Sequence, residues 1–293
     1  MKHLKLTLIA SLIFLVKLNG QTIINNQDGV TTITNHNQDG VTTITNQGET
    51  ITIGQGETIT IDHGNIIISG QGNAKIKRVK GNGDVTKITR STSDYEAIRC
   101  AGAFDYMLVA GSEGNITIEG EENLLQYIVT QVKGDELIVT QLNGVSLSTS
   151  SNKTIKVTIP FQDINEVSLA GSGDLWNRDC ITASKLDVSL KGSGDIILDI
   201  KTDTVEGHIK GSGNLTLKGG TENLDAKISG SGDFHAFGLE SNNTVVSVSG
   251  SGDASVVSNV SIKARVSGSG DIKYKGNPNK TYFRVVGSGS INN

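Results

Sequence analysis

The sequence predicts an all-β protein, and within that class a right-handed parallel β-helix (a β-solenoid) with coils of about 19 residues. Three observations lead to this prediction. A Gly-Ser-Gly turn motif recurs at nearly constant intervals in the C-terminal half, and apolar residues alternate with polar ones on both sides of each turn. The chain also holds 36 Gly against 2 Pro, with only 4% aromatic residues. Small and branched apolar side chains suit a narrow core between many turns.

The turn motif is Gly-Ser-Gly followed by Asp, Asn or Ser. Its seven copies begin at Gly171, Gly192, Gly211, Gly230, Gly250, Gly268 and Gly287, at intervals of 21, 19, 19, 20, 18 and 19 residues. Extended, such a unit is about 60 Å long, which suits one coil of a solenoid. One unit cannot bury its own apolar face, so neighbouring units must stack. Propeller blades would need roughly forty residues each, and the intervals exclude them.

Period-two alternation predicts which side chains of each coil point inward. The apolar residues two positions before the turns are Leu169, Leu190, Ile209, Ile228, Val248, Val266 and Val285. Four positions before the turns stand Val188, Gly207, Ala226, Val246, Ala264 and Phe283. Directly after the turns come Leu175, Ile196, Leu215, Phe234, Ala254 and Ile272. We expect these three columns to form the core.

Residues 1–20 predict a secretory signal peptide. Lys2 and Lys5 precede an apolar run over residues 6–16, which is too short to span a bilayer, and a cleavage site can follow Gly20. We therefore expect an exported protein located in the periplasm, on the cell surface or outside the cell. No other segment is long and apolar enough to be a transmembrane helix.

Residues 21–90 carry a second, shorter repeat. The block 27–35 recurs eleven residues later, and Gly-Glu-Thr-Ile-Thr-Ile occurs at Gly48 and again at Gly56. Each unit is a glycine-marked turn followed by a short strand of alternating Thr and Ile. Two interpretations stay open: a spacer, or a set of β-hairpins or narrow coils.

Residues 91–293 resemble the auto-transporter adhesin, head GIN domain family, whose members are secreted or envelope proteins mostly of Bacteroidetes. The resemblance lies in the entry segment 93–98, the segment 122–128, the Gly-Ser-Gly-Asp turns and the closing segment 274–278. It implies a β-helix-like fold, a short helical turn at 122–128, and adhesion as the activity that the family name suggests.

The formal net charge of −4 argues against a nucleic-acid partner. We expect a glycan or a cell-surface protein as the partner, with a homo-oligomer as a further option. The two cysteines, Cys100 and Cys180, are too few for a disulfide scaffold or a zinc site. They can pair with each other, or each can fill a small niche in the core.

The residue after the turns forms an acidic column of Asp174, Asp195, Asp233, Asp253 and Asp271. Stacked carboxylates are candidates for binding calcium, the only cofactor that the sequence suggests. The alternative is that they cap the turns, since a short side-chain oxygen can hydrogen-bond the backbone there. Asn214 and Ser290 stand in the same column and share that oxygen without the charge. They favour capping.

The sequence predicts no catalytic residues and no enzyme. Its five histidines form no metal-binding spacing and accompany no nucleophile motif. Trp176 and Arg178 are the candidate ligand contacts, expected in an outward loop, because an exposed Trp beside Arg can stack on a sugar or a protein. The predicted function is adhesion or ligand binding by a secreted, non-enzymatic β-solenoid of the bacterial cell envelope. The alternatives are a polysaccharide-acting enzyme and a purely structural envelope scaffold.

Overall fold

The computed structural model describes residues 77–293 in full and, before residue 77, the backbone of the eight strands β1–β8. The chain divides into two compact units. The first comprises residues 1–80 and 141–148, and the second comprises residues 81–140 and 149–293. The predicted signal peptide lies outside the described residues, except for the backbone of β1 and β2.

Two antiparallel sheets make up most of the first unit. Their strand orders are β1-β2-β5-β6 and β3-β4-β7-β8. The bounds are β1 (Leu4–Thr7), β2 (Ile13–Lys17), β3 (Thr22–Gln27), β4 (Val30–Asn35), β5 (Thr42–Asn46), β6 (Glu49–Ile53), β7 (Glu57–Asp62) and β8 (Asn65–Gly70). The pairs β3–β4, β5–β6 and β7–β8 are consecutive antiparallel strands, so the short repeats form β-hairpins. In addition, β9 (Lys77–Lys80) pairs in parallel with β16 (Val145–Ser148).

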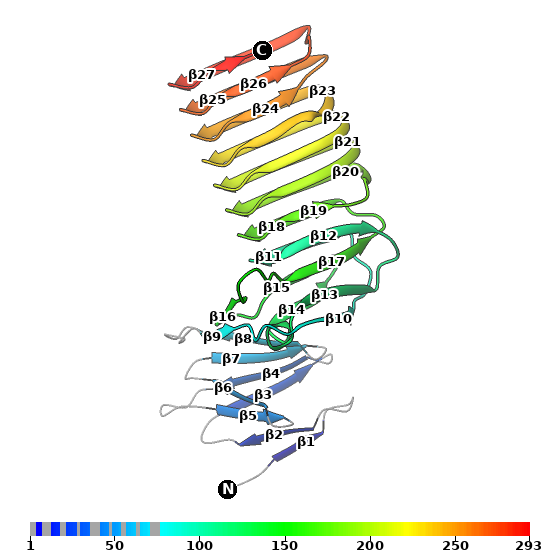
Figure 1. The fold of residues 1–293 in the computed structure, drawn as a ribbon, viewed down its shortest axis with the longest axis vertical. Helices are drawn as coiled ribbons and strands as arrows, with labels where there is room; N and C mark the ends of the chain where they lie inside the picture. Colours follow the sequence, from blue (N-terminus) through cyan, green and yellow to red (C-terminus); the bar gives the residue numbers. More distant parts are fainter. Residues whose placement is uncertain are drawn as a thin grey trace. The chain divides into compact units, whose positions relative to one another are not determined.

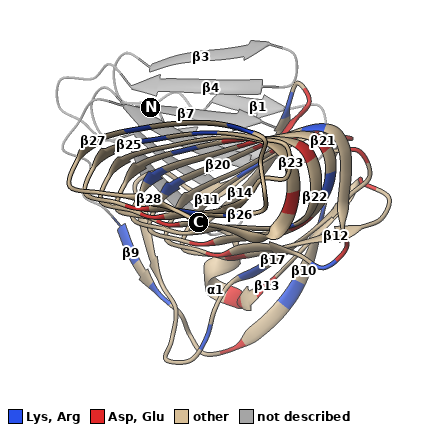
Figure 2. Ribbon diagram, turned by 90° about the horizontal axis from the view of Figure 1, so that it is seen from above, with Lys and Arg blue, Asp and Glu red and all other residues tan. Residues whose placement is uncertain are grey.

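The second unit is a parallel β-solenoid, as the sequence predicts. Its stacked strands are β11 (Ala97–Gly102), β12 (Asp105–Ala110), β18 (Glu166–Gly171), β19 (Leu175–Asn177), β20 (Ile181–Gly192), β21 (Ile196–Gly211), β22 (Leu215–Gly230), β23 (Phe234–Gly250), β24 (Ala254–Val257), β25 (Ser261–Gly268), β26 (Ile272–Lys275), β27 (Lys280–Gly287) and β28 (Ile291–Asn292). Strands β18 to β27 follow one another up the stack (Figure 1). Seen from above, successive coils lie over one another (Figure 2).

The Gly-Ser-Gly turns stack in register. The first glycine of each turn is paired with the first glycine of the next, from Gly171 with Gly192 to Gly268 with Gly287. The coil length is therefore about 19 residues, as the intervals in the sequence predict.

An earlier coil precedes the one that the first Gly-Ser-Gly turn marks. Gly102 is in register with Gly171, although they are far apart in the chain. Residues 111–165 are inserted between these two coils. The insertion contains β13 (Asn115–Glu121), α1 (Glu122–Leu125), β14 (Ile128–Lys133), β15 (Glu136–Gln141) and β17 (Lys156–Phe161). Strand β10 (Val85–Ser91) lies before it in the chain and pairs with β13 in antiparallel orientation. The short helix α1 confirms the helical turn that the resemblance implies.

The three predicted inner columns form the core of the solenoid. Every apolar side chain in them is buried except on β27, the last long strand of the described stack. There Phe283 and Val285 are 41% and 43% exposed. The alternation in the sequence therefore identified the inward face of each coil correctly.

Close backbone contact explains why the turns contain glycine. The carbonyl oxygen of Gly171 accepts hydrogen bonds from the N–H groups of both Ser193 and Gly194 on the next coil, at 2.9 and 3.1 Å. A Cβ atom at Gly194 would lie 1.9 Å from the carbonyl oxygen of Gly173. Gly192 also has a φ of +126°, a backbone conformation that favours glycine. A side chain at position 194 would force the coils apart.

Candidate functional site

The acidic column holds neighbouring turns together. The backbone N–H of Asp195 donates to Oδ1 of Asp174 at 3.1 Å, and the same bond recurs from Asp253 to Asp233 and from Asp271 to Asp253, each at 2.8 Å. Each of these carboxylates thus accepts a hydrogen bond from the equivalent residue one coil further on.

Asn214, which is uncharged, accepts the same type of hydrogen bond as these carboxylates. Its Oδ1 accepts a hydrogen bond from the backbone N–H of Asp233 at 3.1 Å. This supports capping as the role of the column. Among residues 77–293, no group of three or more His, Cys, Asp or Glu side chains is arranged to hold a metal ion.

The two candidate contact residues lie on or directly after β19. Trp176 belongs to this strand rather than to the expected outward loop, and it is in register with Met107 and Ile197. The ammonium group of Lys156 lies 5.7 Å from the centroid of the Trp176 ring. The tryptophan therefore forms part of an outward strand surface, because β19 continues the stack from β12 to β21.

Arg178 has a partner of its own. Its guanidinium forms an ion pair with the carboxylate of Asp179 at 3.1 Å. The same carboxylate accepts the backbone N–H of Ala110 at 2.9 Å. These hydrogen bonds, first that of Ala110 and then that of Arg178, lower the pKa of Asp179. Arg178 thus takes part in anchoring this segment to β12.

The outward surface of the strands that precede the turns carries three polar columns, the first across β20–β22 and the other two across β20–β23. The first column, which we call the ion-pair column, is Asp187, Glu206 and Asp225. The second is Ser189, His208, Lys227 and Ser247. The third, directly before the turns, is Lys191, Lys210, Ser229 and Ser249. We call the second and third columns the groove columns.

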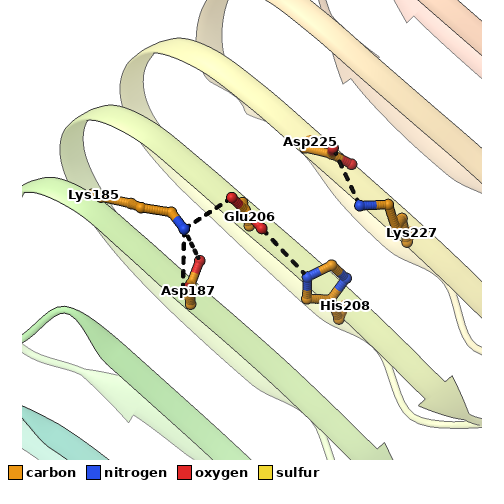
Figure 3. A network of polar contacts seen from close by, with 6 residues as sticks. All are labelled: Lys185, Asp187, Glu206, His208, Asp225 and Lys227. Carbon is orange, nitrogen blue, oxygen red and sulfur yellow. Dashed lines mark hydrogen bonds and ion pairs between the residues drawn. The ribbon is translucent and has the colours of Figure 1, made fainter.

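Ion pairs connect the ion-pair column to basic groups on both sides (Figure 3). Lys185 Nζ lies 3.3 Å from Asp187 on its own strand and 2.9 Å from Glu206 on the next coil. Lys227 lies 3.2 Å from Asp225. The hydrogen bond that Lys185 donates to Glu206, followed by the one it donates to Asp187, raises the pKa of Lys185, and Lys185 lowers the pKa of Glu206. The lysines are exposed and the carboxylates partly exposed, so the pairs serve mainly to order the surface.

The groove columns line a hollow of about 610 Å³ on this surface. Three lysines, one histidine and four serines contribute to its walls, together with two residues of the inner column, Ile209 and Ile228. The hollow crosses four successive coils. Its volume lies within the range of about 300–1,000 Å³ that is usual for ligand sites.

Sequence reasoning did not single out the lysines of this hollow. A signal existed, because Lys191 and Lys210 stand directly before Gly-Ser-Gly in two consecutive repeats. Aligning the columns outside the core would have brought them together. Their surroundings become visible only in the folded chain.

A second, smaller hollow of about 260 Å³ is lined mainly by acidic side chains: Asp94, Glu96, Glu113, Asp135 and Asp163. Glu113 fastens two chain segments there. Its carboxylate accepts the backbone N–H of Tyr95 at 2.7 Å and that of Gln162 at 3.1 Å. Glu113 therefore joins these two segments and has a structural role.

The two cysteines are unpaired. Cys100 is buried on β11, and burial raises the pKa of its thiol well above the usual value. Cys180 is exposed. The option of a disulfide between them is therefore wrong, and the option of a core niche is confirmed for Cys100 and wrong for Cys180.

No helix in the described part of the chain has the length and apolar character needed to cross a membrane.

Comparison with known proteins gives one family and several solved structures of similar fold. A family model described as "Putative auto-transporter adhesin, head GIN domain" matches residues 94–278, more than half of the chain. No curated protein matches the chain.

Solved structures share the solenoid. A putative adhesin from Bacteroides fragilis NCTC 9343 has a TM-score of 0.69 at 23% identity, with 73% of this chain and 99% of that chain covered. A putative lipid binding protein from Parabacteroides distasonis ATCC 8503 has a TM-score of 0.64 at 25% identity, with 74% and 99% covered. A putative adhesin from the same organism has a TM-score of 0.59 at 26% identity, with 74% and 99% covered.

Proposed function

The chain belongs to the auto-transporter adhesin, head GIN domain family, and from this premise we propose that it is a non-enzymatic adhesion module of the cell envelope. Its ligand is a glycan or a cell-surface protein, bound on the outward surface of the solenoid. The export that the N-terminal sequence predicts belongs to the same proposal.

The hollow over β20–β23 is the observation that supports this proposal most directly. Equivalent positions on neighbouring coils are about 4.8 Å apart, so an extended ligand would meet a new set of side chains at each coil. Weak contacts that repeat along one ligand add up to useful affinity without any single strong contact. A stacked repeat is well suited to this type of binding.

A screen of the full chain on a glycan array, together with a pull-down from cell-surface proteins, tests the proposal. We expect one class of ligand to retain the labelled chain reproducibly. An excess of unlabelled chain should compete for that ligand and reduce the retention. If no glycan and no surface protein is retained, the adhesion proposal is wrong. Release of reducing ends or of unsaturated sugars from a glycan would instead indicate a polysaccharide-acting enzyme.

A structural scaffold is the second candidate, and β27 is the observation that favours it. This strand exposes four large apolar or aromatic side chains: Tyr282, Phe283, Val285 and Val286. Exposed strands with apolar side chains promote association between chains. Light scattering over a range of concentrations tests this candidate, since a scaffold would form oligomers whereas an adhesion module need not.

A further inference from the structure

We propose that Lys191 and Lys210 form an anion-binding site, and that its ligand is an acidic polysaccharide bearing carboxylate or sulfate groups. The inference rests on the proposed adhesion function and specifies the ligand class of the groove.

The charges of these two lysines are not neutralised within the described protein. Lys191 on β20 and Lys210 on β21 are register partners, so two like charges lie on neighbouring strands. Both side chains are exposed, and neither forms an ion pair or a hydrogen bond within residues 77–293. Like charges in this arrangement repel each other, and an anion between them would remove the repulsion.

The other lysines on the same surface provide the contrast. Lys185 is paired with Asp187 and Glu206, and Lys227 is paired with Asp225. The carboxylates of the ion-pair column are thus paired with the basic groups beside them and form no ion pair with the column nearest the turns. The two lysines without partners are the ones that face the hollow from that column.

Serine hydroxyls complete the hollow around the lysines. Ser229 and Ser249 continue the lysine column over the next two coils, and Ser189 and Ser247 stand in the second groove column. None of these hydroxyls hydrogen-bonds another group in the fully described part of the chain. A hydroxyl both donates and accepts, which suits the hydroxyl groups of a sugar.

The arrangement favours a polysaccharide over other polyanions. From Lys191 to Ser249 the column rises through three coil steps, about 14 Å, with charge at one end and hydroxyls at the other. A ligand with spaced anionic groups and many hydroxyls fits this order. With two unpaired positive charges over this rise, the column cannot match the phosphates of a nucleic acid, whose duplex carries one charge per about 1.7 Å. The two isoleucines in the walls, Ile209 and Ile228, are buried residues of the inner column, so the side chains open to a ligand are those of lysine, histidine and serine.

Isothermal titration of the full chain with polygalacturonate, heparin and neutral dextran tests the assignment. The test variant is Lys191→Gln/Lys210→Gln. The matched control is Lys218→Gln/Lys273→Gln, which removes the same charge from two exposed lysines outside the hollow.

We expect an acidic polymer to bind and dextran not to bind. The affinity for the acidic polymer should fall about tenfold or more in the test variant, because charge-assisted contacts are lost. The control variant and Lys191→Arg/Lys210→Arg should bind like the unmodified chain. Equal melting temperatures establish that all variants fold.

Several results would overturn the assignment. An equal loss in the test and control variants would mean that net charge alone attracts the polymer, and an unchanged affinity in the test variant would place binding elsewhere. Binding to phosphatidylglycerol vesicles but to neither acidic polymer would make a lipid headgroup the ligand. If the glycan array retains only neutral sugars, this inference fails while the adhesion proposal stands. If it retains nothing and no surface protein binds, the adhesion proposal fails as well.

Discussion

The carboxylate of Asp195 accepts two hydrogen bonds from Asn214 on the next coil, one from the backbone N–H at 2.9 Å and one from the side-chain amide at 3.1 Å. Both bonds end on the same oxygen, Oδ1. A residue that could have been a metal ligand is therefore occupied in joining two turns of the solenoid. The same relation recurs between Asp271 and Ser290, at 2.7 Å from the backbone and 2.8 Å from the hydroxyl.

Substitutions at Asp195 distinguish between a role in turn capping and a role in calcium binding. We expect Asp195→Asn to retain most of the stability, because an amide oxygen accepts the same bonds, as Asn214 does toward Asp233. Asp195→Ala leaves the Asn214 groups without their acceptor and should lower the free energy of unfolding by about 1 kcal/mol. Urea denaturation measures both.

Asp203→Ala is the control, since this exposed carboxylate takes part in no hydrogen bond or ion pair within residues 77–293. Calcium should leave the melting temperature of the unmodified chain unchanged. A rise with calcium that Asp195→Asn abolishes would instead establish the acidic column as a calcium site.

The core leaves no room for a side chain at Gly207, because the ring of Phe234 packs against this glycine. A Cβ atom at position 207 would lie 2.7 Å from Cε2 of the Phe234 ring. We therefore expect Gly207→Val to lower the free energy of unfolding by about 1–3 kcal/mol through overpacking. Phe234→Leu in the same chain should recover part of this loss, which a double-mutant cycle would quantify.

Gly220 provides the matched control on β22. A Cβ atom there would meet no atom within 4 Å, and its φ lies outside the left-handed region. Gly220→Ala should be neutral or slightly stabilising. An equal cost at both glycines would show that β-strand glycines matter here for backbone reasons rather than for packing.

Stability should also depend on pH through Glu121, a buried carboxylate. The hydroxyl of Ser150 hydrogen-bonds it, as do the backbone N–H groups of Ser150 at 2.8 Å and Gly83 at 2.6 Å. These bonds hold the pKa of Glu121 below the ordinary value of 4.5, and the bond from the Ser150 hydroxyl has the largest effect. Between the ordinary and the lowered pKa only the unfolded chain takes up the proton. The free energy of unfolding should therefore fall as the pH drops through this window.

Glu121→Gln should flatten that part of the pH profile, whereas Glu119→Gln, an exposed neighbour on β13, should leave it unchanged. Denaturation between neutral and acidic pH provides the profile. A profile for Glu121→Gln that parallels the unmodified chain would assign the acid sensitivity to other carboxylates.

The repeat explains how much of the fold could be predicted. Each Gly-Ser-Gly turn marks the same point of a coil, so inward positions such as Leu190 and Ile209 follow by counting from the turn. The first coil lies within the predicted domain, but the turn motif does not mark it, because Phe104 stands where later turns have glycine. Its partner Gly171 also lies beyond a long insertion, and pairing over such a distance leaves no local pattern in the sequence.

The site was less predictable than the fold for a physical reason. Trp176 and Arg178 stood out as rare residue types, yet Arg178 has Asp179 as its partner. Lysines are common, and what distinguishes Lys191 and Lys210 is that they are register partners of each other, with no acidic residue in register with either one. That property depends on neighbouring coils, since the closest partner of Lys185 is Glu206, one coil away.

Chemical footprinting of lysines tests the central claim, that the solenoid binds its ligand in the hollow over β20–β23, most directly. The full chain would be acetylated with a limiting amine-reactive reagent, with and without saturating polygalacturonate or heparin, and each lysine quantified by mass spectrometry. We predict that the ligand protects Lys191 and Lys210 strongly while Lys201, Lys218 and Lys273 react as before. Protection centred on Lys156 beside Trp176, or spread evenly over all lysines, would contradict the claim.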